Sequence, residues 1–387
     1  MKNKIGIVTA TRAEYGILKP LIVQLRRQPE FEVQLYVTGT HLEERYGNTI
    51  QEIEADGIPV SRKVQILEQG NRPYEVSLTM AKALRGFAQV FLEEKPDLLI
   101  VLGDRTEMLG ICAAAVDECI PIAHLHGGEL TEGAVDDCVR HAITKMSYLH
   151  FPAAEVYRKR IIQMGESPDR VFMVGALGVE NIKKAPLLTE DEIRRQCWIP
   201  QDKKYAVVTF HPVTMENGTE ERQVQALIDA MEEKKEYFYL ITKANSDAGG
   251  EKVNAMLGAY ADQKEHVRLV DSLGMIRYLS AVRYAAFVLG NSSSGIIEAP
   301  ALGTPTVNIG DRQKGRLLAD TVISCDTTAE AIVQAICQAK ITVHRVSDLY
   351  GDGETAEKIV CHLKEFFAQN SGQVHKQFYD LPQDVIR

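Results

Sequence analysis

Short apolar runs alternate with longer amphipathic stretches along most of the chain. The apolar runs are rich in β-branched residues and almost continuously hydrophobic, which is typical of strands buried on both faces. In the first half of the chain these predicted strands lie at residues 5–9, 32–37, 98–102, 120–124 and 148–151. In the second half they lie at residues 205–210, 237–242, 267–270, 285–289 and 306–309.

Helical patterns separate the predicted strands. They fall near residues 17–27, 74–92, 107–117 and 136–146, and again near 221–233, 251–261 and 276–281. Strands that alternate with helices indicate parallel sheets covered by helices on both faces. Because the pattern runs twice, we expect two doubly wound α/β domains facing one another across a cleft.

The length of 387 residues also favours two domains, because single cores rarely exceed about 250–300 residues. We place the hinge within residues 178–204, which contain Pro186, Pro200 and a charged run. The predicted N-terminal domain is 1–180 and the C-terminal domain is 181–355. A final helix within 356–380 is expected to pack back on the N-terminal domain.

Composition and charge narrow the possible partners. The formal net charge of −9 argues against binding to nucleic acid or to an acidic membrane surface, so local basic residues must hold any anionic ligand. The seven cysteines include no C-x-x-C pair, which indicates a reducing, cytoplasmic setting without structural disulfides or a metal site. No apolar run approaches the roughly 18 residues of a membrane span.

The segment GNSSSGIIE at residues 290–298 is the most informative one for ligand binding. It follows a predicted strand and opens a predicted helix, so serine hydroxyls and free backbone N–H groups meet at a helix N-terminus. That combination favours anions, although serine-rich helix caps without any ligand are also common. Glu298 follows about one turn later, where it suits sugar hydroxyls better than phosphate. Phosphate together with ribose predicts a nucleotide ligand.

Other polar clusters also follow predicted strands, where open parallel sheets bind their ligands. In the first half these clusters are TRAEY at 11–15, GDR at 103–105, HGGE at 126–129, and Asp136, Asp137, Arg140 and His141. In the second half they are His211, KANSD at 243–247 and GDRQKGR at 310–316. Carboxylates and histidine thus belong to the first domain, and phosphate-binding residue types belong to the second. This division predicts an acid/base site facing a nucleotide site.

The sequence leaves the role of His41 open, and it lacks two common nucleotide-binding motifs. His41 is compatible with either a surface turn or a functional role. No G-x-G-x-x-G follows the first strand and no G-x-x-x-x-G-K-[ST] occurs, which counts against NAD and ATP.

The motifs together resemble a known family. They are TATRAEYG, VTGTHLEERYGNTI, VLGDRTE, HLHGGE, DDCVRHAITKMS, HPVT, ANSDAG, GNSSSGIIEAPALGTPTVNIGDRQKGR and YGDG, spread over residues 4–365. In this order and spacing they are similar to the hydrolysing UDP-N-acetylglucosamine 2-epimerases of bacterial sialic-acid and legionaminic-acid pathways, and to the epimerase half of the bifunctional animal enzyme. The resemblance implies two Rossmann-like domains of the GT-B type.

The resemblance also implies a reaction. Removal of the C2 proton of UDP-GlcNAc and loss of UDP would give 2-acetamidoglucal, and water would then add to give ManNAc. The implied partner is a UDP-HexNAc substrate, with no cofactor and no metal. The relatives self-associate, so a homodimer or homotetramer is expected.

Residue roles follow from the same resemblance. The implied catalytic residues are Asp104, His126, Glu129, Asp136 and His211, with Asp137 as a weaker candidate. The implied UDP contacts, to which His211 also belongs, are Arg12, Arg105, Asn245, Ser292, Ser293, Ser294, Glu298 and Arg312. His126 stands where relatives carry a catalytic glutamate, which leaves the identity of the C2 base open.

Alternative functions stay open at this point. One is the same reaction on UDP-N,N′-diacetylbacillosamine, and another is a non-hydrolysing epimerase that releases UDP-ManNAc. A GT-B glycosyltransferase would share the nucleotide site but would leave the acidic cluster unexplained. The last alternative is a non-catalytic sensor of nucleotide sugars.

Overall fold

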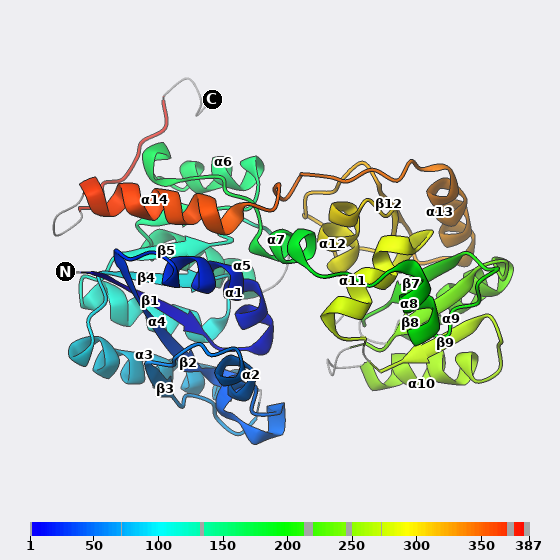
Figure 1. Cartoon of the computed structure of the whole chain (residues 1–387), viewed down its shortest axis with the longest axis horizontal. Coiled ribbons are helices and arrows are strands. Elements are labelled where there is room, and N and C mark those ends of the chain that lie inside the picture. Colours follow the sequence, from blue (N-terminus) through cyan, green and yellow to red (C-terminus); the bar gives the residue numbers. More distant parts are fainter. Residues whose placement is uncertain are drawn as a thin grey trace. The chain divides into compact units, whose positions relative to one another are not determined.

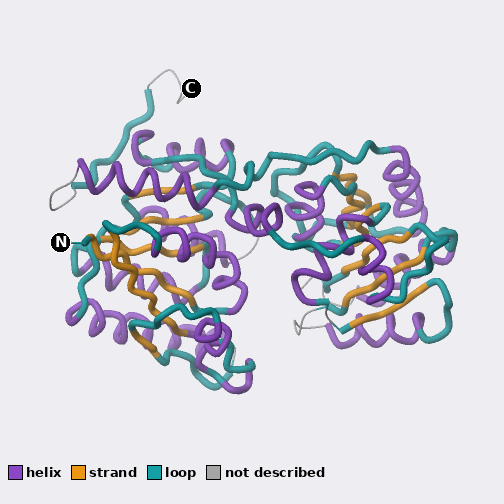
Figure 2. The backbone as a smooth tube through the Cα atoms, viewed as in Figure 1, coloured by secondary structure: helices purple, strands orange, loops and turns teal. Residues whose placement is uncertain are grey.

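The computed structural model describes residues 2–70, 72–131, 135–212, 220–244, 250–271, 273–369 and 375–382. The chain forms two compact units (Figure 1). The first unit comprises Met1–Asn181 together with Gly351–Arg387, and the second comprises Ile182–Tyr350. Each unit contains a six-stranded parallel sheet with helices packed against it (Figure 2). The predicted fold class, a pair of Rossmann-like doubly wound α/β domains, is therefore confirmed.

The sheet of the first unit has the strand order β3-β2-β1-β4-β5-β6. Its strands are β1 (Asn3–Thr9), β2 (Phe31–Thr38), β3 (Arg62–Val64), β4 (Leu98–Leu102), β5 (Ile122–Leu125) and β6 (Leu149–Phe151). Its α-helices are α1 (Arg12–Arg26), α2 (Ile50–Ala55), α3 (Pro73–Glu93), α4 (Thr106–Asp117), α5 (Val135–Met146), α6 (Glu155–Gln163) and α14 (Thr355–Gln369). Short 3-10 helices lie at Gly39–Leu42, Glu44–Tyr46 and Pro168–Arg170.

Helices cover both faces of this sheet because its strands are apolar on both faces. Ile5 and Ile7 of β1 enter a core shared with α1 and α14, whereas Val8 enters the core formed with α3 and α4. Helix α14 follows the second unit in the chain and packs along α1 of the first unit (Figure 1). Its first turn is fixed there by the backbone N–H of Ala356, which donates to Glu180 over 2.7 Å.

The sheet of the second unit has the strand order β12-β11-β10-β7-β8-β9. Its strands are β7 (Tyr205–Thr209), β8 (Phe238–Thr242), β9 (Val267–Val270), β10 (Phe287–Gly290), β11 (Thr306–Ile309) and β12 (Val322–Cys325). Its helices are α8 (Glu190–Gln196), α9 (Glu220–Glu233), α10 (Gly250–Ala261), α11 (Gly274–Tyr284), α12 (Ser294–Leu302) and α13 (Ala329–Ile341). Helix α7 (Leu177–Lys184) spans the boundary between the units.

The structure contains helices and edge strands that the sequence patterns did not predict, and it moves the start of one helix. The helices that were not predicted are α2, α6, α7, α8 and α13. The edge strands β3 and β12 were not predicted, because both are short and only half-buried. Helix α1 begins at Arg12, several residues before the predicted start near 17, because Thr11 caps it. The Thr11 hydroxyl accepts from the backbone N–H of Glu14 over 3.2 Å.

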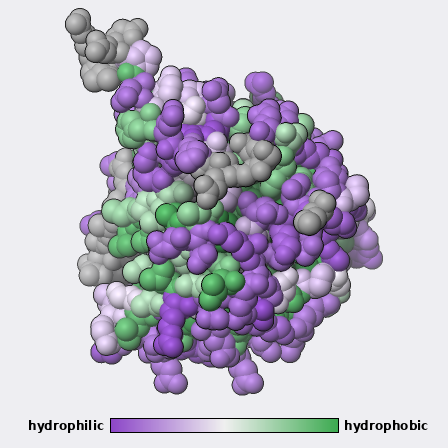
Figure 3. Space-filling view, turned by 90° about the vertical axis from the view of Figure 1, so that its left-hand side faces the viewer, coloured by the Kyte–Doolittle hydropathy of each residue, from purple (hydrophilic) through white to green (hydrophobic). Residues whose placement is uncertain are grey.

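The part of the chain that the structure describes contains no candidate membrane-spanning helix. No helix there is long and apolar enough to cross a bilayer. The face drawn in Figure 3 is mostly hydrophilic, with smaller hydrophobic areas between the polar side chains.

A buried carboxylate fixes the C-terminal segment to the first unit. Glu166 is fully buried and accepts from Lys145 (2.6 Å), Lys376 (2.9 Å) and His150 (3.1 Å). Burial alone would raise the pKa of Glu166, but the hydrogen bonds from these three groups outweigh it and lower the pKa to about 2. Lys376 also donates to the carbonyl of Ser147, so the segment is held at the end of α5.

The substitution Glu166→Gln should therefore destabilise the first unit strongly. It leaves two lysines without their carboxylate, and breaking a buried ion pair typically costs about 3–5 kcal/mol. Urea denaturation at pH 7 would measure the loss. Glu365→Gln is the matched control, because Glu365 is exposed and pairs only at the surface with His362. Equal losses for the two variants would contradict the account.

Candidate active site

A buried arginine contacts several of the predicted acidic site residues of the first unit. Arg140, on α5, donates to the carboxylate of Asp104 and, over 2.6 Å, to that of Asp137. It also donates to the backbone carbonyl of Glu129 (2.9 Å) and to the Thr131 hydroxyl (3.2 Å). The loops after β4 and β5 and the first turn of α5 therefore meet at one guanidinium at the carboxyl edge of the sheet.

The charges and the burial of this cluster shift the pKa values of Arg140 and Asp136. Burial lowers the pKa of Arg140, but the carboxylates of Asp104, Glu129 and Asp137 outweigh burial and leave that pKa above its ordinary value. Asp136 lies at the surface beside the cluster. Partial desolvation, followed by the negative charge of Asp104, raises the pKa of Asp136. Asp136 thus holds a proton more readily than an ordinary aspartate, which suits a general acid.

His126 and Glu129 form a contact of their own at the end of β5. The imidazole Nδ1 lies 2.9 Å from Oε1 of Glu129. The imidazole Nε2 is buried and has no hydrogen-bond partner among the described residues. His126 also has a left-handed backbone, with φ at 62°, which is uncommon for a residue other than glycine.

Sequence reasoning missed Glu14 as an individual site residue. Its Oε2 accepts from the backbone N–H of Ala10 (2.9 Å) and the hydroxyl of Thr11 (3.3 Å), and its Oε1 is buried and unpartnered in the described structure. Burial raises the pKa of Glu14 to about 7, against the opposing charge of Arg105. A glutamate three residues after Thr11 is a capping-box pattern, and this signal was available in the sequence.

The predicted basic residues of the first unit have separate partners. Arg105 donates to Glu107 over 2.6 Å and lies close enough to Glu14 for their charges to interact. Arg12 is largely exposed on the first turn of α1 and forms an ion pair with Glu52 at 3.0 Å.

His41 is a structural residue. It is fully buried, with Nε2 3.0 Å from the Thr9 hydroxyl and Nδ1 2.8 Å from the Thr49 hydroxyl. Burial lowers the pKa of His41 to about 4. A neutral imidazole with both nitrogens paired ties the end of β1 to the segment after β2. Of the two interpretations left open by the sequence, a surface turn is excluded.

In the second unit, buried Asn291 organises the carboxyl edge of the sheet. Its side chain accepts from the backbone N–H of His211 (2.7 Å) and donates to the His211 carbonyl (2.8 Å). The backbone carbonyl of Asn291 accepts from Arg312 (3.1 Å) and Gln313 (2.9 Å). One residue therefore holds together the loops after β7, β10 and β11, and sequence analysis did not single it out.

The serine-rich segment begins α12 as predicted. Ser293 is the N-cap residue, and the Ser292 hydroxyl accepts from the backbone N–H of Ser294. Ser294 in turn donates to Glu298 and accepts from the Tyr278 hydroxyl over 2.8 Å. Desolvation raises the pKa of Glu298, and the hydrogen bond from Ser294 opposes it. Asn245, also predicted to contact the nucleotide, lies outside the described residues.

The structure thus places the predicted residues in two local groups. Asp104, Glu129 and Asp137 contact Arg140, with Asp136 and His126 beside them. Asn291 directly contacts His211 and Arg312, and α12 carries the serines and Glu298. In the described residues, no group of three or more His, Cys, Asp or Glu side chains is arranged to hold a metal ion.

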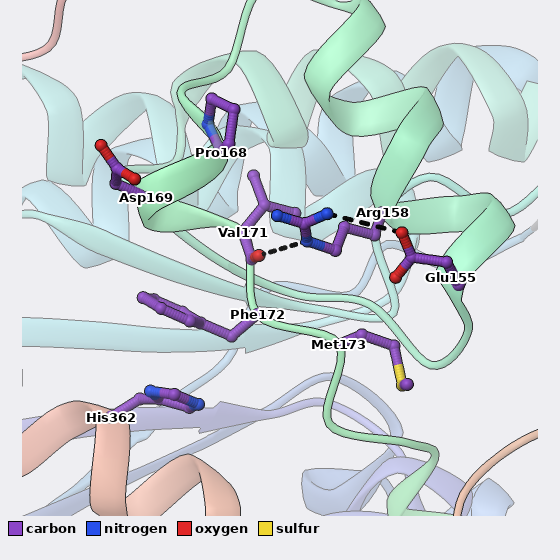
Figure 4. A pocket seen from close by; sticks show the side chains of 8 residues that line it. All are labelled: Glu155, Arg158, Pro168, Asp169, Val171, Phe172, Met173 and His362. Carbon is purple, nitrogen blue, oxygen red and sulfur yellow. Dashed lines mark hydrogen bonds and ion pairs between the residues drawn. The ribbon is translucent and has the colours of Figure 1, made fainter.

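A cavity of about 450 Å³ beyond β6 contains none of these residues (Figure 4). It is lined by Glu155, Arg158, Pro168, Asp169, Val171, Phe172, Met173 and His362. Arg158 is engaged by Glu155 and by the carbonyl of Val171, and Phe172 stacks on His362 at 4.0 Å. The cavity is therefore separate from the Arg140 cluster.

The two Rossmann-like units define an α/β protein of the GT-B-like class, with an arginine–carboxylate cluster on one unit and a serine-rich helix start on the other. The chain belongs to the UDP-N-acetylglucosamine 2-epimerase family, whose model matches residues 23–364.

Two relatives are similar to the chain in sequence, and one solved structure is similar to it in fold. It is 38% identical to the GDP/UDP-N,N′-diacetylbacillosamine 2-epimerase (hydrolyzing) of Campylobacter jejuni, over 84% of this chain and 85% of that one. It is 36% identical to the polysialic acid biosynthesis protein P7 of Escherichia coli, over 98% of each chain. The UDP-GlcNAc 2-epimerase of Neisseria meningitidis, solved with UDP-GlcNAc, has the same fold. That match has a TM-score of 0.81 at 18% identity and covers 94% of this chain and all of that one.

The raised pKa of Glu14 predicts a pH-dependent stability difference. A carboxyl whose folded-state pKa exceeds its unfolded value of 4.5 costs stability as the pH rises from that value to about 7. Glu14→Gln lacks this loss, so its free energy of unfolding should gain on wild type by roughly 3 kcal/mol between pH 4.5 and pH 8.

Urea denaturation at both pH values would measure this difference. Glu32→Gln, at an exposed position of β2, is the control and should follow wild type at both pH values. If the free energy of unfolding of Glu14→Gln changed between the two pH values as much as that of wild type, the result would contradict a raised pKa of Glu14.

Proposed function

We propose that the protein is a hydrolysing 2-epimerase that converts UDP-GlcNAc and water into ManNAc and UDP. The observation that carries this proposal is the Arg140 cluster, in which the carboxylates of Asp104 and Asp137 and the backbone carbonyl of Glu129 accept hydrogen bonds from one buried guanidinium. A reaction that removes one proton and delivers another needs acid and base groups close together on a rigid frame.

The first chemical step is the removal of the C2 proton and the loss of UDP from C1. The C2 proton is only weakly acidic, so a positioned base and a well-stabilised leaving group must act together. The product of this elimination is 2-acetamidoglucal. Asp104, which is ion-paired with Arg140, is proposed to be held in the orientation that the reacting sugar requires.

The second step adds water across the double bond with inverted configuration at C2. Carbon C2 then receives a proton, and C1 receives the hydroxyl group. The raised pKa of Asp136 supports a role as the proton donor, because the residue keeps a proton closer to neutral pH than aspartate usually does. Asp137 holds Arg140 in place and so supports the cluster indirectly.

The second unit is proposed to bind UDP. Helix α12 offers backbone N–H groups, serine hydroxyls and a favourable dipole to the diphosphate, with Arg312 and His211 held nearby through Asn291. Glu298 is proposed to accept from the ribose hydroxyls, and Arg12, Arg105 and Asn245 complete the proposed nucleotide contacts. The proposal requires neither a cofactor nor a metal, and a homodimer or homotetramer stays a prediction.

A second candidate substrate is UDP-N,N′-diacetylbacillosamine. The Campylobacter jejuni relative that carries this name is 38% identical to the chain, which supports it as strongly as the Escherichia coli relative supports a sialic-acid pathway. Both candidates share the C2 chemistry and the UDP group, and they differ at C4 and C6 of the sugar.

A parallel assay of both sugars tests the proposed reaction. The purified protein is incubated separately with UDP-GlcNAc and with UDP-N,N′-diacetylbacillosamine, and the nucleotide and sugar products are separated by chromatography. We expect UDP and free ManNAc from the first substrate. Turnover of the second substrate alone would reassign the sugar, release of UDP-ManNAc would show a non-hydrolysing epimerase, and no turnover of either would contradict the proposal.

The variant Asp104→Asn should separate catalysis from binding. We expect kcat to fall about 10³-fold because the charge of a group in the acid/base cluster is lost, while calorimetric UDP affinity stays nearly unchanged. Asp169→Asn, at an exposed position of the same unit and outside the cluster, should keep wild-type kcat. Wild-type turnover in Asp104→Asn would remove Asp104 from the catalytic set.

A further inference from the structure

The C2 base is not identified by the Arg140 cluster alone, but the contact between His126 and Glu129 distinguishes one group from the others. We propose that His126 removes the C2 proton through Nε2 and that Glu129 is the residue that positions it. The inference rests on the proposed function and assigns one of its proton transfers.

The contact fixes which ring nitrogen is available. Because a carboxylate can only accept, the 2.9 Å contact between Oε1 of Glu129 and Nδ1 favours the tautomer in which Nδ1–H donates to Glu129. Nε2 then carries the lone pair and can accept a proton. When it does so, the Glu129 carboxylate faces the new positive charge. This is the arrangement by which an acidic residue commonly orients and supports a histidine base.

The free nitrogen is the second observation. Nε2 of His126 is buried and has no hydrogen-bond partner among the described residues, although buried polar atoms are nearly always paired. The neighbouring His124 shows the contrast, because its Nε2 lies 2.7 Å from the Gly103 carbonyl and its Nδ1 3.2 Å from the Thr144 hydroxyl. Two histidines of one strand end therefore differ, and only His126 keeps a nitrogen for a bound molecule.

The backbone around His126 is held rigidly in this position. The residue has a φ of 62°, and its N–H donates to the carbonyl of Phe151 over 3.2 Å. Gly128 has a φ of 78°, and a Cβ there would approach the Tyr157 carbonyl to 2.5 Å. An uncommon backbone conformation that is fixed by its surroundings is typical of functional sites.

Two arginines secure the same loop from neighbouring helices. Arg160 of α6 donates to the carbonyl of Gly128, and Arg140 of α5 donates to the carbonyl of Glu129 over 2.9 Å. The distance between Nδ1 and the carboxylate is thus set by a braced loop, which a base needs if it is to meet C2 repeatedly in one geometry.

The charged groups near the pair of His126 and Glu129, called the dyad below, come from several elements. Besides Glu129 on its own loop, they are Asp104 after β4, Asp136, Asp137 and Arg140 on α5, and Arg160 on α6. His124 does not compete as a base near neutral pH, because burial lowers its pKa to about 3.

The proposed step removes the C2 proton and releases UDP. Nε2 of His126 forms a bond to the C2 proton, and the electrons of the C2–H bond form the C1–C2 double bond. The C1–O bond to the diphosphate breaks, and UDP leaves with that electron pair. His126 becomes an imidazolium beside the Glu129 carboxylate and returns its proton to solvent before the next turnover.

The test compares His126→Gln, His126→Glu and Glu129→Gln with wild type, using kcat, UDP affinity and the pH dependence of kcat/KM. His126→Gln should lose about 10³-fold in kcat and still bind UDP. His126→Glu restores a proton acceptor and should recover activity relative to His126→Gln. Glu129→Gln should lose about tenfold to a hundredfold, with the acidic limb of its pH profile moved to lower pH, because the imidazolium has lost its carboxylate.

The chain offers a matched control in His362 and Glu365. Their Nδ1 and Oε2 atoms lie 3.1 Å apart at the same sequence spacing, on α14 and outside the cluster. His362→Gln should keep the kcat and the pH profile of wild type. A purely structural role for Glu129 would lower activity without moving the acidic limb.

The outcomes separate this inference from the proposed function. A wild-type protein inert toward both UDP-sugars overturns the proposed function and the dyad with it. If the wild type is active and the kcat of His126→Gln lies within tenfold of the wild-type kcat, the dyad is overturned and the proposed function stands. If His126→Gln fails to bind UDP, the pH profile of Glu129→Gln decides between the outcomes. An acidic limb at the wild-type pH overturns the dyad, and an acidic limb at lower pH supports it.

Discussion

One buried guanidinium sets the geometry of the first unit's carboxyl edge. Asp104 and Asp137 would repel one another at close range, and Arg140 makes their approach favourable by donating to both. It stays in place because α5 buries Val139 and Ile143 beside it in the core. The apolar face of one helix thus fixes the guanidinium that Asp104, Asp137 and the backbone of Glu129 all contact, and the proposed chemistry depends on this arrangement.

The second unit uses a neutral residue for the same purpose. Asn291 pairs with both backbone groups of His211 and offers its carbonyl to Arg312, without adding charge to a region that is proposed to receive a diphosphate. A carboxylate at this position would repel that ligand. The two units therefore organise their strand ends differently, one around a guanidinium cation and one around a neutral amide.

Much of this architecture could be predicted from the sequence, because strands buried on both faces are nearly continuously apolar. The same logic predicted that Asp104, His126 and Ser292–Ser294 follow strands, and the structure has them there. Their roles in ligand binding and catalysis stay predictions. The edge strands β3 and β12 were missed because one side of an edge strand has no neighbour, so its apolar pattern is weak.

The central roles of Arg140 and Asn291 and the burial of Glu14 could not be predicted. They arise from contacts between segments far apart in the chain. A local pattern indicates which residue types follow a strand, but not which of them become the partner of several others. His41 illustrates this limit, because its sequence surroundings resemble a turn while its ring is buried between two threonine hydroxyls.

Proton NMR of the reaction in D2O tests the central claim most directly, that this protein exchanges the C2 proton of a UDP-linked 2-acetamido sugar while releasing UDP. The account predicts free ManNAc, or the corresponding diacetylated sugar, with deuterium at C2 and inverted configuration at that carbon. A released sugar that keeps its original C2 proton and configuration would show simple hydrolysis at C1 and would contradict the account.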